Sequence, residues 1–250
     1  MRQLVLDGVA LSYEEAGEGE PPVSLVHGWC CDHTYFARQF EHFVKKGCRV
    51  VTVDLRGHGR SDKPHQPYTI QVFANDIARM CERLGLEKPV VVGHSIGGIV
   101  AFDLAARYPN LTSAVVMLDA AVVLPSGVRA AIPSFLEELR SPGYRDLLCG
   151  YVANFLFIPT DARQRKERIL QSMSAAPQHV MGLAFEGLRD YDPTEAAGGL
   201  AVPGLYVAAG ELQPRSDMAR FHESSRRFCS VRPLAQGTSV SYKCPSRSTR

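Results

Sequence analysis

One serine stands where the chain could use its hydroxyl as a nucleophile. Gly93, Ser95 and Gly97 form a Gly-x-Ser-x-Gly pattern, with a β-branched run at 90–92 before it and a helical pattern at 99–108 after it. A sharp strand-to-helix turn lifts such a serine clear of the sheet, and flanking glycines remove Cβ atoms that would collide there. The spacing therefore predicts a nucleophile elbow with Ser95 as its catalytic residue.

Bulk composition limits the class of protein. With 250 residues, 45% of them hydrophobic, the chain fits one sizeable domain with a substantial core. A net charge of +2 is too small to indicate nucleic-acid binding, and we find neither a membrane-spanning apolar run nor a signal peptide. Seven scattered cysteines without a CxxC pair favour reduced thiols in a cytoplasmic protein. We therefore expect no metal, no cofactor and no membrane partner.

Strand and helix patterns alternate along the first half of the chain, which predicts an α/β fold. Short apolar runs bounded by Gly and Pro are separated by helical spacing, and this order favours a mostly parallel sheet with helices on both faces. The expected strands lie at 4–6, 11–15, 23–26, 50–53, 90–92, 114–118 and 205–208. We expect a helix at 215–227 after the last of them.

Residues 120–199 interrupt this alternation. They show helical patterns divided by prolines and no convincing strand, which predicts a helical cap over the carboxyl edge of the sheet. The expected organisation is a core at 1–119 and 200–223, the cap at 120–199 and a tail at 224–250. Aromatic residues of the cap suit the wall of an apolar pocket and core packing equally well. They are Phe135, Tyr144, Tyr151, Phe155, Phe157 and Phe185.

Four segments, in this order, resemble the α/β-hydrolase superfamily. They are His27-Gly28, the loop DLRGHGRSD at 54–62, the elbow GHSIGG at 93–98, and the strand at 205–208 with the glycine after it. The resemblance covers residues 1–222 and implies a Ser–acid–His hydrolase with a cap between the sixth and seventh strands of the family sheet. A serine at the elbow argues against haloalkane dehalogenases and epoxide hydrolases, which use aspartate there.

The resemblance also implies roles for individual residues. The backbone N–H groups of Trp29 and Ile96 would form the oxyanion hole. The His27 side chain is expected to hold its loop by hydrogen bonding, with Gly28 and the two elbow glycines serving the backbone geometry.

The acid and the base are less plainly marked. Where the family commonly places the acid, this chain has Gln213, so Asp119 and Asp217 are equal candidates and Glu211 is a weaker one. The acid would hold the imidazole in one tautomer and stabilise its cation. No histidine follows His222, although the family expects one near the C-terminus.

The tail at 224–250 is rich in Ser and Arg and lacks amphipathic periodicity. We therefore expect that the last strand and helix of the fold are lost, that the seventh strand is left as a sheet edge, and that the product is marginally stable. Our hypothesis is a shifted reading frame beginning near Ser224. With suitable codons, residues 235–238 read one base back give Ala-Gly-His.

Two functions follow from these patterns. The first is a serine hydrolase that cleaves an ester or related acyl bond of a small apolar substrate through an acyl-enzyme. The second is a catalytically impaired homologue, because the C-terminal histidine is absent. Fold alone sets neither the substrate nor the oligomeric state.

Overall fold

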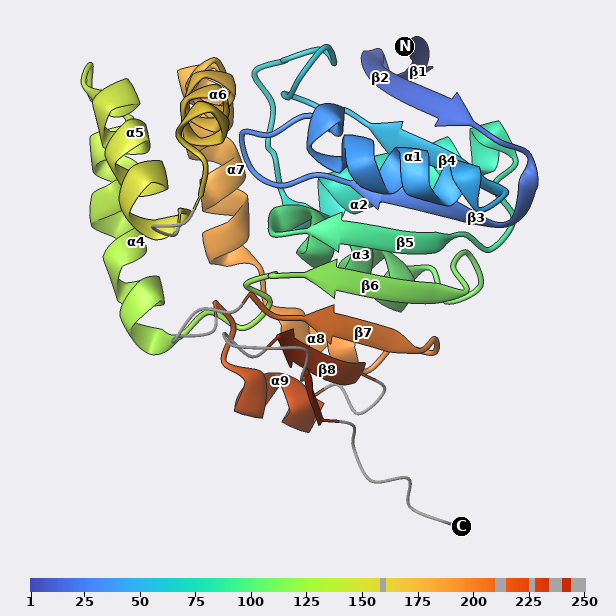
Figure 1. Ribbon diagram of the computed structural model, residues 1–250. Coiled ribbons are helices and arrows are strands. Elements are labelled where there is room, and N and C mark those ends of the chain that lie inside the picture. Colours follow the sequence, from blue (N-terminus) through green and yellow to red (C-terminus); the bar gives the residue numbers. More distant parts are fainter. Residues whose placement is uncertain (158–160, 210–214, 225–227, 234–239, 244–250) are drawn as a thin grey trace.

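The computed structural model describes residues 1–157, 161–209, 215–224, 228–233 and 240–243. Within these ranges, nine strands form one sheet in the order β1-β2-β4-β3-β5-β6-β7-β8-β9 (Figure 1). Neighbouring strands from β4 to β8 are parallel, and antiparallel pairing is confined to the two ends of the sheet. The predicted mostly parallel sheet is confirmed.

The strands are β1 (Arg2–Leu6), β2 (Val9–Ala16), β3 (Gly19–Val26), β4 (Cys48–Val53), β5 (Val90–His94), β6 (Ala114–Leu118), β7 (Gly204–Val207), β8 (Phe228–Pro233) and β9 (Val240–Lys243). A 3-10 turn, η1 (His33–Phe36), precedes the first helix. The helices are α1 (Ala37–Lys45), α2 (Ile70–Leu84), α3 (Ile96–Arg107), α4 (Ser126–Leu139), α5 (Tyr144–Phe155), α6 (Arg163–Ser174), α7 (Gln178–Asp190), α8 (Pro193–Ala197) and α9 (Met218–Ser224).

Helices cover the two faces of the sheet unequally. Helix α3 packs on β5 and β6 with α2 and α8 against it, and its residues from Ile96 to Ala106 are buried. A helix that is apolar on all sides is typical of a protein core, so the larger hydrophobic core lies on this face of the sheet. On the opposite face α1 packs on β4, over a smaller core that includes Leu25, Phe36 and Val92.

Helix α2 shows how local sequence sets the ends of an element. Thr69 precedes it in extended conformation, and its Oγ1 accepts a hydrogen bond from the N–H of Val72 at 3.2 Å. Gly85 ends the helix with φ +59°, a left-handed conformation that costs glycine little. The buried stripe between these ends includes Phe73 and Ile77, as the helical spacing predicts.

Helices α4 to α8 connect β6 to β7 (Figure 1). Figure 1 shows α4, α5, α6 and α7 standing together beyond the carboxyl ends of the central strands. This segment holds the aromatic residues named above, and it places them over the end of the sheet where β5 passes into α3. None of its described residues forms a strand.

The C-terminal part of the chain differs from expectation. Strand β8 pairs parallel with β7, and β9 pairs antiparallel with β8, so the expectation that β7 is left as a sheet edge is wrong. No helix follows β8 among the described residues. Helix α9 (Met218–Ser224) begins after the predicted start at 215, because Asp217 caps it there; residues 225–227 of the predicted helix lie outside the described residues. Residues 228–231 are Phe-Cys-Ser-Val, three of them apolar, and such a segment forms a strand once β7 supplies hydrogen bonds.

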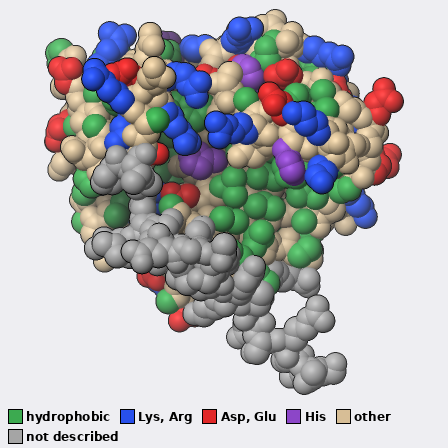
Figure 2. All heavy atoms as spheres, in the orientation of Figure 1, with side chains coloured by type: hydrophobic (Ala, Val, Ile, Leu, Met, Phe, Trp, Pro, Cys, Tyr) green, Lys and Arg blue, Asp and Glu red, His purple; other side chains and the backbone are tan. Residues whose placement is uncertain are grey.

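The remaining observations concern membrane crossing, the cysteines and one exposed face of the sheet. Among the described residues, no helix combines the length and apolarity that crossing a membrane requires. Five of the cysteines that the structure describes are free thiols, whereas Cys229 in β8 is disulfide-bonded, so the expectation of reduced thiols does not hold for Cys229. Figure 2 shows hydrophobic side chains gathered on the face of β5, β6 and β7, beside the strands that α1 covers.

Candidate active site at the nucleophile elbow

Ser95 lies at the turn between β5 and α3. Its backbone has φ +53° and ψ −122°, a conformation that non-glycine residues rarely adopt outside functional sites. The N–H of Ser95 donates to the carbonyl of Leu118 at 2.9 Å, and its own carbonyl accepts from Gly98 N at 3.0 Å. The residue is partly exposed, so its hydroxyl is not packed away in the interior. This is the strained strand-to-helix turn that the sequence predicts.

The two elbow glycines permit a very close approach of backbones. A Cβ built on Gly93 would lie 2.0 Å from the carbonyl oxygen of Gly97. One built on Gly97 would lie 2.2 Å from the Val26 oxygen and 2.4 Å from the His27 oxygen. No side chain fits at these distances, so β3, β5 and α3 can meet here only through glycine.

The loop after β3 lies against the nucleophile. A Cβ built on Gly28 would approach Ser95 Cβ to 3.1 Å and His94 Nδ1 to 3.0 Å. The next residue, Trp29, and the first residue of α3, Ile96, both have backbone N–H groups that donate to no acceptor among the described residues. Ile96 N–H is also one of the unpaired donors of a helix N-terminus, where the helix dipole favours negative charge. Two free donors therefore flank the serine.

His27 holds this loop in place. Its Nε2 accepts from the N–H of Leu55 at 3.0 Å, so the proton resides on Nδ1, which donates to Gly28 O at 2.8 Å. Complete burial lowers the pKa of His27 below its usual value and keeps the imidazole neutral. Both ring nitrogens therefore form hydrogen bonds, and the bond to Leu55 connects the loop after β3 to the loop after β4.

The acid candidates occupy different positions. Asp119 follows β6 with φ +48°, accepts from Ala209 N at 3.2 Å, and pairs with the Arg215 guanidinium. Asp217 caps α9 by accepting from Arg220 N at 3.2 Å, and its own N–H donates to Val123 O at 2.8 Å. Glu211 lies outside the described residues.

Histidines near the elbow have other partners in the described part of the chain. His222 Nε2 lies 3.1 Å from Ser230 Oγ, between α9 and β8. His94 packs beside Gly28, and burial lowers its pKa. No histidine hydrogen-bonds the Ser95 hydroxyl among the described residues, so a general base is not assembled there.

Helices α4, α5 and α7 contact the loop beside the elbow through Trp29. The indole Nε1 donates to Met181 O in α7 at 3.1 Å. The centroid of its ring lies 5.0 Å from that of Phe185 in α7 and 6.3 Å from those of Phe135 in α4 and Tyr151 in α5. These aromatic side chains enclose Trp29, whereas Phe155 at the end of α5 is 63% exposed. This contact is beyond sequence reasoning, because it joins residues about 150 positions apart in the chain.

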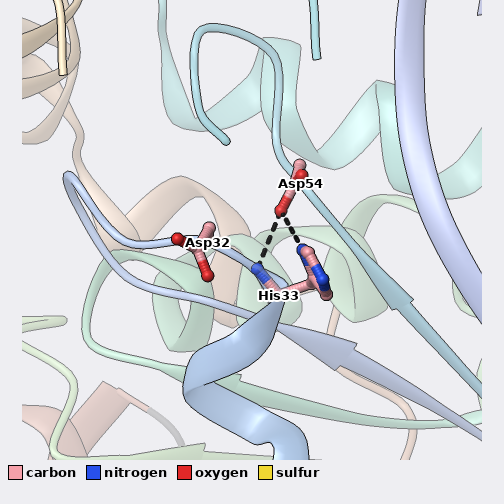
Figure 3. A group of neighbouring side chains, drawn as sticks. All are labelled: Asp32, His33 and Asp54. Atoms are coloured by element: carbon pink, nitrogen blue, oxygen red, sulfur yellow. Dashed lines mark hydrogen bonds and ion pairs between the residues drawn. The ribbon is translucent and has the colours of Figure 1, made fainter. Parts of the chain in front are cut away.

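A second polar cluster lies beside the elbow loop. Asp54 Oδ1 accepts from both the backbone N and the side-chain Nδ1 of His33, each at 2.8 Å, and Asp32 lies next to them (Figure 3). The Asp54 carboxyl is fully buried, and its hydrogen bonds with His33 and Arg60 hold its pKa below the usual value against the effect of burial. The sequence gives one indication of this cluster. Because β3 and β4 pair in parallel, the loops that follow them meet at the same edge of the sheet.

Comparisons with known proteins agree with this geometry. Residues 21–185 match the model of the alpha/beta hydrolase fold family. A bifunctional esterase/perhydrolase of Acinetobacter calcoaceticus is 35% identical over 219 residues, which cover 80% of this chain and 78% of that protein. A superfamily protein of Bacillus subtilis, YisY, is 35% identical over 136 residues, which cover 54% of this chain and only 46% of that protein.

Solved structures show the same fold. A hydrolase from Pseudomonas aeruginosa superimposes with a TM-score of 0.81 at 22% identity, covering 93% of this chain and 89% of the other. An esterase from Exiguobacterium antarcticum gives the same score and identity, with coverages of 92% and 88%. The strained Ser95 turn, the glycine contacts around it and the family match over more than half of the chain lead to one conclusion: this chain belongs to the α/β-hydrolase fold family.

Proposed function

We propose that the protein is a serine hydrolase that cleaves an ester or related acyl bond of a small apolar substrate. Ser95 Oγ bonds to the acyl carbon while its proton passes to solvent water, and the N–H groups of Trp29 and Ile96 stabilise the negative charge that develops on the carbonyl oxygen. The intermediate then expels the alcohol, which takes a proton from water, and a water molecule hydrolyses the acyl-enzyme. The observation that carries the proposal is the pair of backbone N–H groups, those of Trp29 and Ile96, that donate to no acceptor among the described residues and lie beside the strained, partly exposed Ser95. The aromatic side chains around Trp29 support an apolar acyl group.

In this proposal Asp119 is the acid. It follows β6, and β6 pairs with the strand that ends at the nucleophile, with His94 opposite Leu118. Asp217 is the weaker candidate because its carboxylate already caps α9. The Arg215 guanidinium pairs with the Asp119 carboxylate, and a carboxylate in this role stabilises an imidazolium.

A fluorophosphonate probe tests the nucleophile directly, because labelling requires an activated serine. We expect one label per chain, mapped to Ser95 by peptide mass spectrometry and abolished by Ser95→Ala. Ser113→Ala, which alters an exposed serine away from the elbow, should label like the unaltered chain. A folded protein that takes no label at Ser95 contradicts the proposal.

A second function is favoured by one observation: no described histidine reaches the Ser95 hydroxyl. The chain would then be a catalytically impaired member of the family. Loss of one member of a triad removes most of the rate and leaves some oxyanion-hole catalysis.

The reading-frame hypothesis separates the two functions. A version whose frame is restored from Ser224 onward would contain Ala-Gly-His, and we compare its rates on a panel of p-nitrophenyl esters with those of the present chain. A large gain on restoration identifies the present chain as the impaired form. Equal rates identify it as a working hydrolase. A gene sequence that does not spell the expected residues in the other frame ends the reading-frame hypothesis.

A further inference from the structure

The C-terminal end of α5 keeps three consecutive apolar side chains in contact with solvent. Phe155 is 63% exposed, and no other large hydrophobic side chain among the described residues is more exposed. Leu156 and Phe157, which follow it, are partly exposed. Single exposed apolar residues are ordinary on protein surfaces, whereas a contiguous group of them is typical of a surface that binds something.

Helix α6 begins with a run of cations. Residues 161–168 hold four cations and two acids, and the cations are Arg163, Arg165, Lys166 and Arg168. Arg163 pairs with Glu167 at 2.8 Å, whereas the other three form no ion pair with any residue that the structure describes. The helix dipole disfavours positive charge in a first turn, and the first turn of α6 holds no acid to compensate it. The stability of α6 therefore does not account for these cations.

The apolar residues and the cations adjoin each other. Lys166 Nζ lies 5.7 Å from the centroid of the Phe157 ring, which is within the range of a cation–π contact. Helix α5 packs against α6, and Figure 1 shows the two together in the cap. The end of α5 and the first two turns of α6 therefore form one continuous surface, apolar at one side and basic at the other.

We propose that this surface docks on a lipid bilayer that contains anionic headgroups. Exposed aromatic and aliphatic side chains enter the boundary between headgroups and acyl chains, and the neighbouring cations contact the anionic headgroups. An acidic peptide matches the cations alone, whereas an anionic bilayer matches the apolar side chains as well. The expectation of no membrane partner rests on the lack of a spanning run, and docking on a bilayer surface needs no such run.

The docking surface adjoins the end of the sheet that carries the elbow. The Phe155 carbonyl accepts from Arg215 Nη2 at 3.0 Å, and the same guanidinium pairs with Asp119, which follows β6. The residue before it, Leu118, accepts from the N–H of Ser95 at 2.9 Å. Docking thus brings a bilayer to the side of the cap that meets the elbow. Delivery of an apolar ester from the bilayer to Ser95 rests on the proposed function, whereas docking itself does not.

Cosedimentation of the full chain with vesicles tests the docking. We expect binding to vesicles of mixed phosphatidylserine and phosphatidylcholine that weakens as salt rises, and much weaker binding to phosphatidylcholine alone. Arg165→Gln combined with Arg168→Gln should lower the affinity about 25-fold, or about fivefold for each cation. Arg38→Gln combined with Lys46→Gln is the matched control, because it removes two exposed cations from the region of α1 and should leave the affinity unchanged.

Phe155→Ala tests the apolar part of the surface. Loss of the ring removes apolar area that docking buries, so the affinity for the mixed vesicles should fall about tenfold. The backbone carbonyl that accepts from Arg215 is retained in this variant. Val5→Ala is the matched control, because Val5 is 60% exposed on β1 at the far end of the sheet and its truncation should not change binding.

Phe155→Trp adds a readout that does not depend on loss of binding. The new indole should shift its emission to the blue and be quenched by brominated lipids in the mixed vesicles, whereas Trp29, the single tryptophan of the chain, is buried. Failure to bind the mixed vesicles, equal binding to phosphatidylcholine alone, or folded variants that bind like the unaltered chain would overturn the proposal. So would a chain that binds polyuridylate or polyglutamate but no vesicles, which would assign the cations to a nucleic acid or a protein.

Discussion

At the scale of single residues, the strain at Ser95 persists because its neighbours leave the backbone no alternative. A non-glycine residue at φ +53° costs of order 1–3 kcal/mol. That cost is offset by the hydrogen bond of Ser95 N to Leu118 O and by the contacts that Gly93 and Gly97 make with backbone atoms. The close packing of β3, β5 and α3 therefore holds the Ser95 backbone in the conformation that keeps this residue partly exposed.

Gly97→Ala tests this packing. The new Cβ would meet backbone oxygens of Val26 and His27, so we expect the free energy of unfolding to fall by about 3 kcal/mol, the upper end of overpacking costs, with labelling of Ser95 lost. Gly150→Ala is the matched control, because nothing lies within 4 Å of its built Cβ in α5. That change should raise stability by about 0.5–1 kcal/mol. Urea denaturation of both variants measures the difference, and equal stabilities would contradict the account.

Buried imidazoles give stability a pH dependence. Burial lowers the pKa of His58 from 6.5 to about 3 and also lowers that of His27. Between pH 6.5 and these lowered values the unfolded chain binds protons that the folded chain does not, so stability is complete above pH 6.5 and falls as the pH drops.

His58→Asn isolates the contribution of one imidazole, since the amide can still donate to Arg56 O. Below pH 6 we expect the slope of unfolding free energy against pH to decrease by about 1.4 kcal/mol per pH unit, the value for one proton. His42→Asn, on the exposed surface of α1, should leave the slope unchanged. Unfolding curves at pH 7, 6, 5 and 4 provide the measurement, and an unaltered slope in His58→Asn rejects the prediction.

At the scale of elements, the loop after β4 is fixed to α2 by a buried ion pair. Arg56 donates from Nε and Nη2 to the two carboxylate oxygens of Asp76, both at 2.6 Å, with side chains 10% and 4% exposed. The pairing raises the pKa of Arg56. Asp76→Asn leaves the guanidinium buried without its counter-charge, which should cost about 3–5 kcal/mol.

The double variant Arg56→Met with Asp76→Leu is the control for that prediction. Replacement of both charges by apolar groups of similar size often leaves stability almost unchanged, so the double variant should be more stable than Asp76→Asn. Thermal unfolding of the three proteins decides between them. If the double variant is the least stable, the pair contributes through its shape and not through its charges.

Elements differ in how far the sequence determines them. The elbow, the glycine end of α2 and the central strands were predictable because their signals are local: glycine positions and apolar runs. Strand β8 was not, since a strand of mixed polarity forms only when β7 offers a partner. The docking of Trp29 against α7 and the meeting of His33 with Asp54 depend on chain segments brought together by the sheet. Local patterns carry no information on such pairs.

At the scale of the whole molecule, one face of the sheet keeps apolar side chains partly exposed. Val116 pairs with Leu205 and Leu118 with Val207 across β6 and β7, and all four are partly exposed. Figure 2 shows this apolar area as a continuous patch, and α1 packs on β4, beside it. Interior strands of a parallel sheet are normally covered on both faces, and a large exposed apolar patch favours association.

We therefore expect the protein to associate as its concentration rises, through this face. Replacing Val116 and Val207 together by Thr keeps the β-branched shape while making the patch polar, so the association constant should fall about tenfold, equivalent to roughly 1.4 kcal/mol. Val5→Thr is the matched control, because Val5 is 60% exposed on β1 at the far edge of the sheet. Sedimentation velocity over a range of concentrations measures all three proteins. Since added salt strengthens apolar association but screens charge pairing, an association that weakens in salt would assign the contact to charged side chains instead.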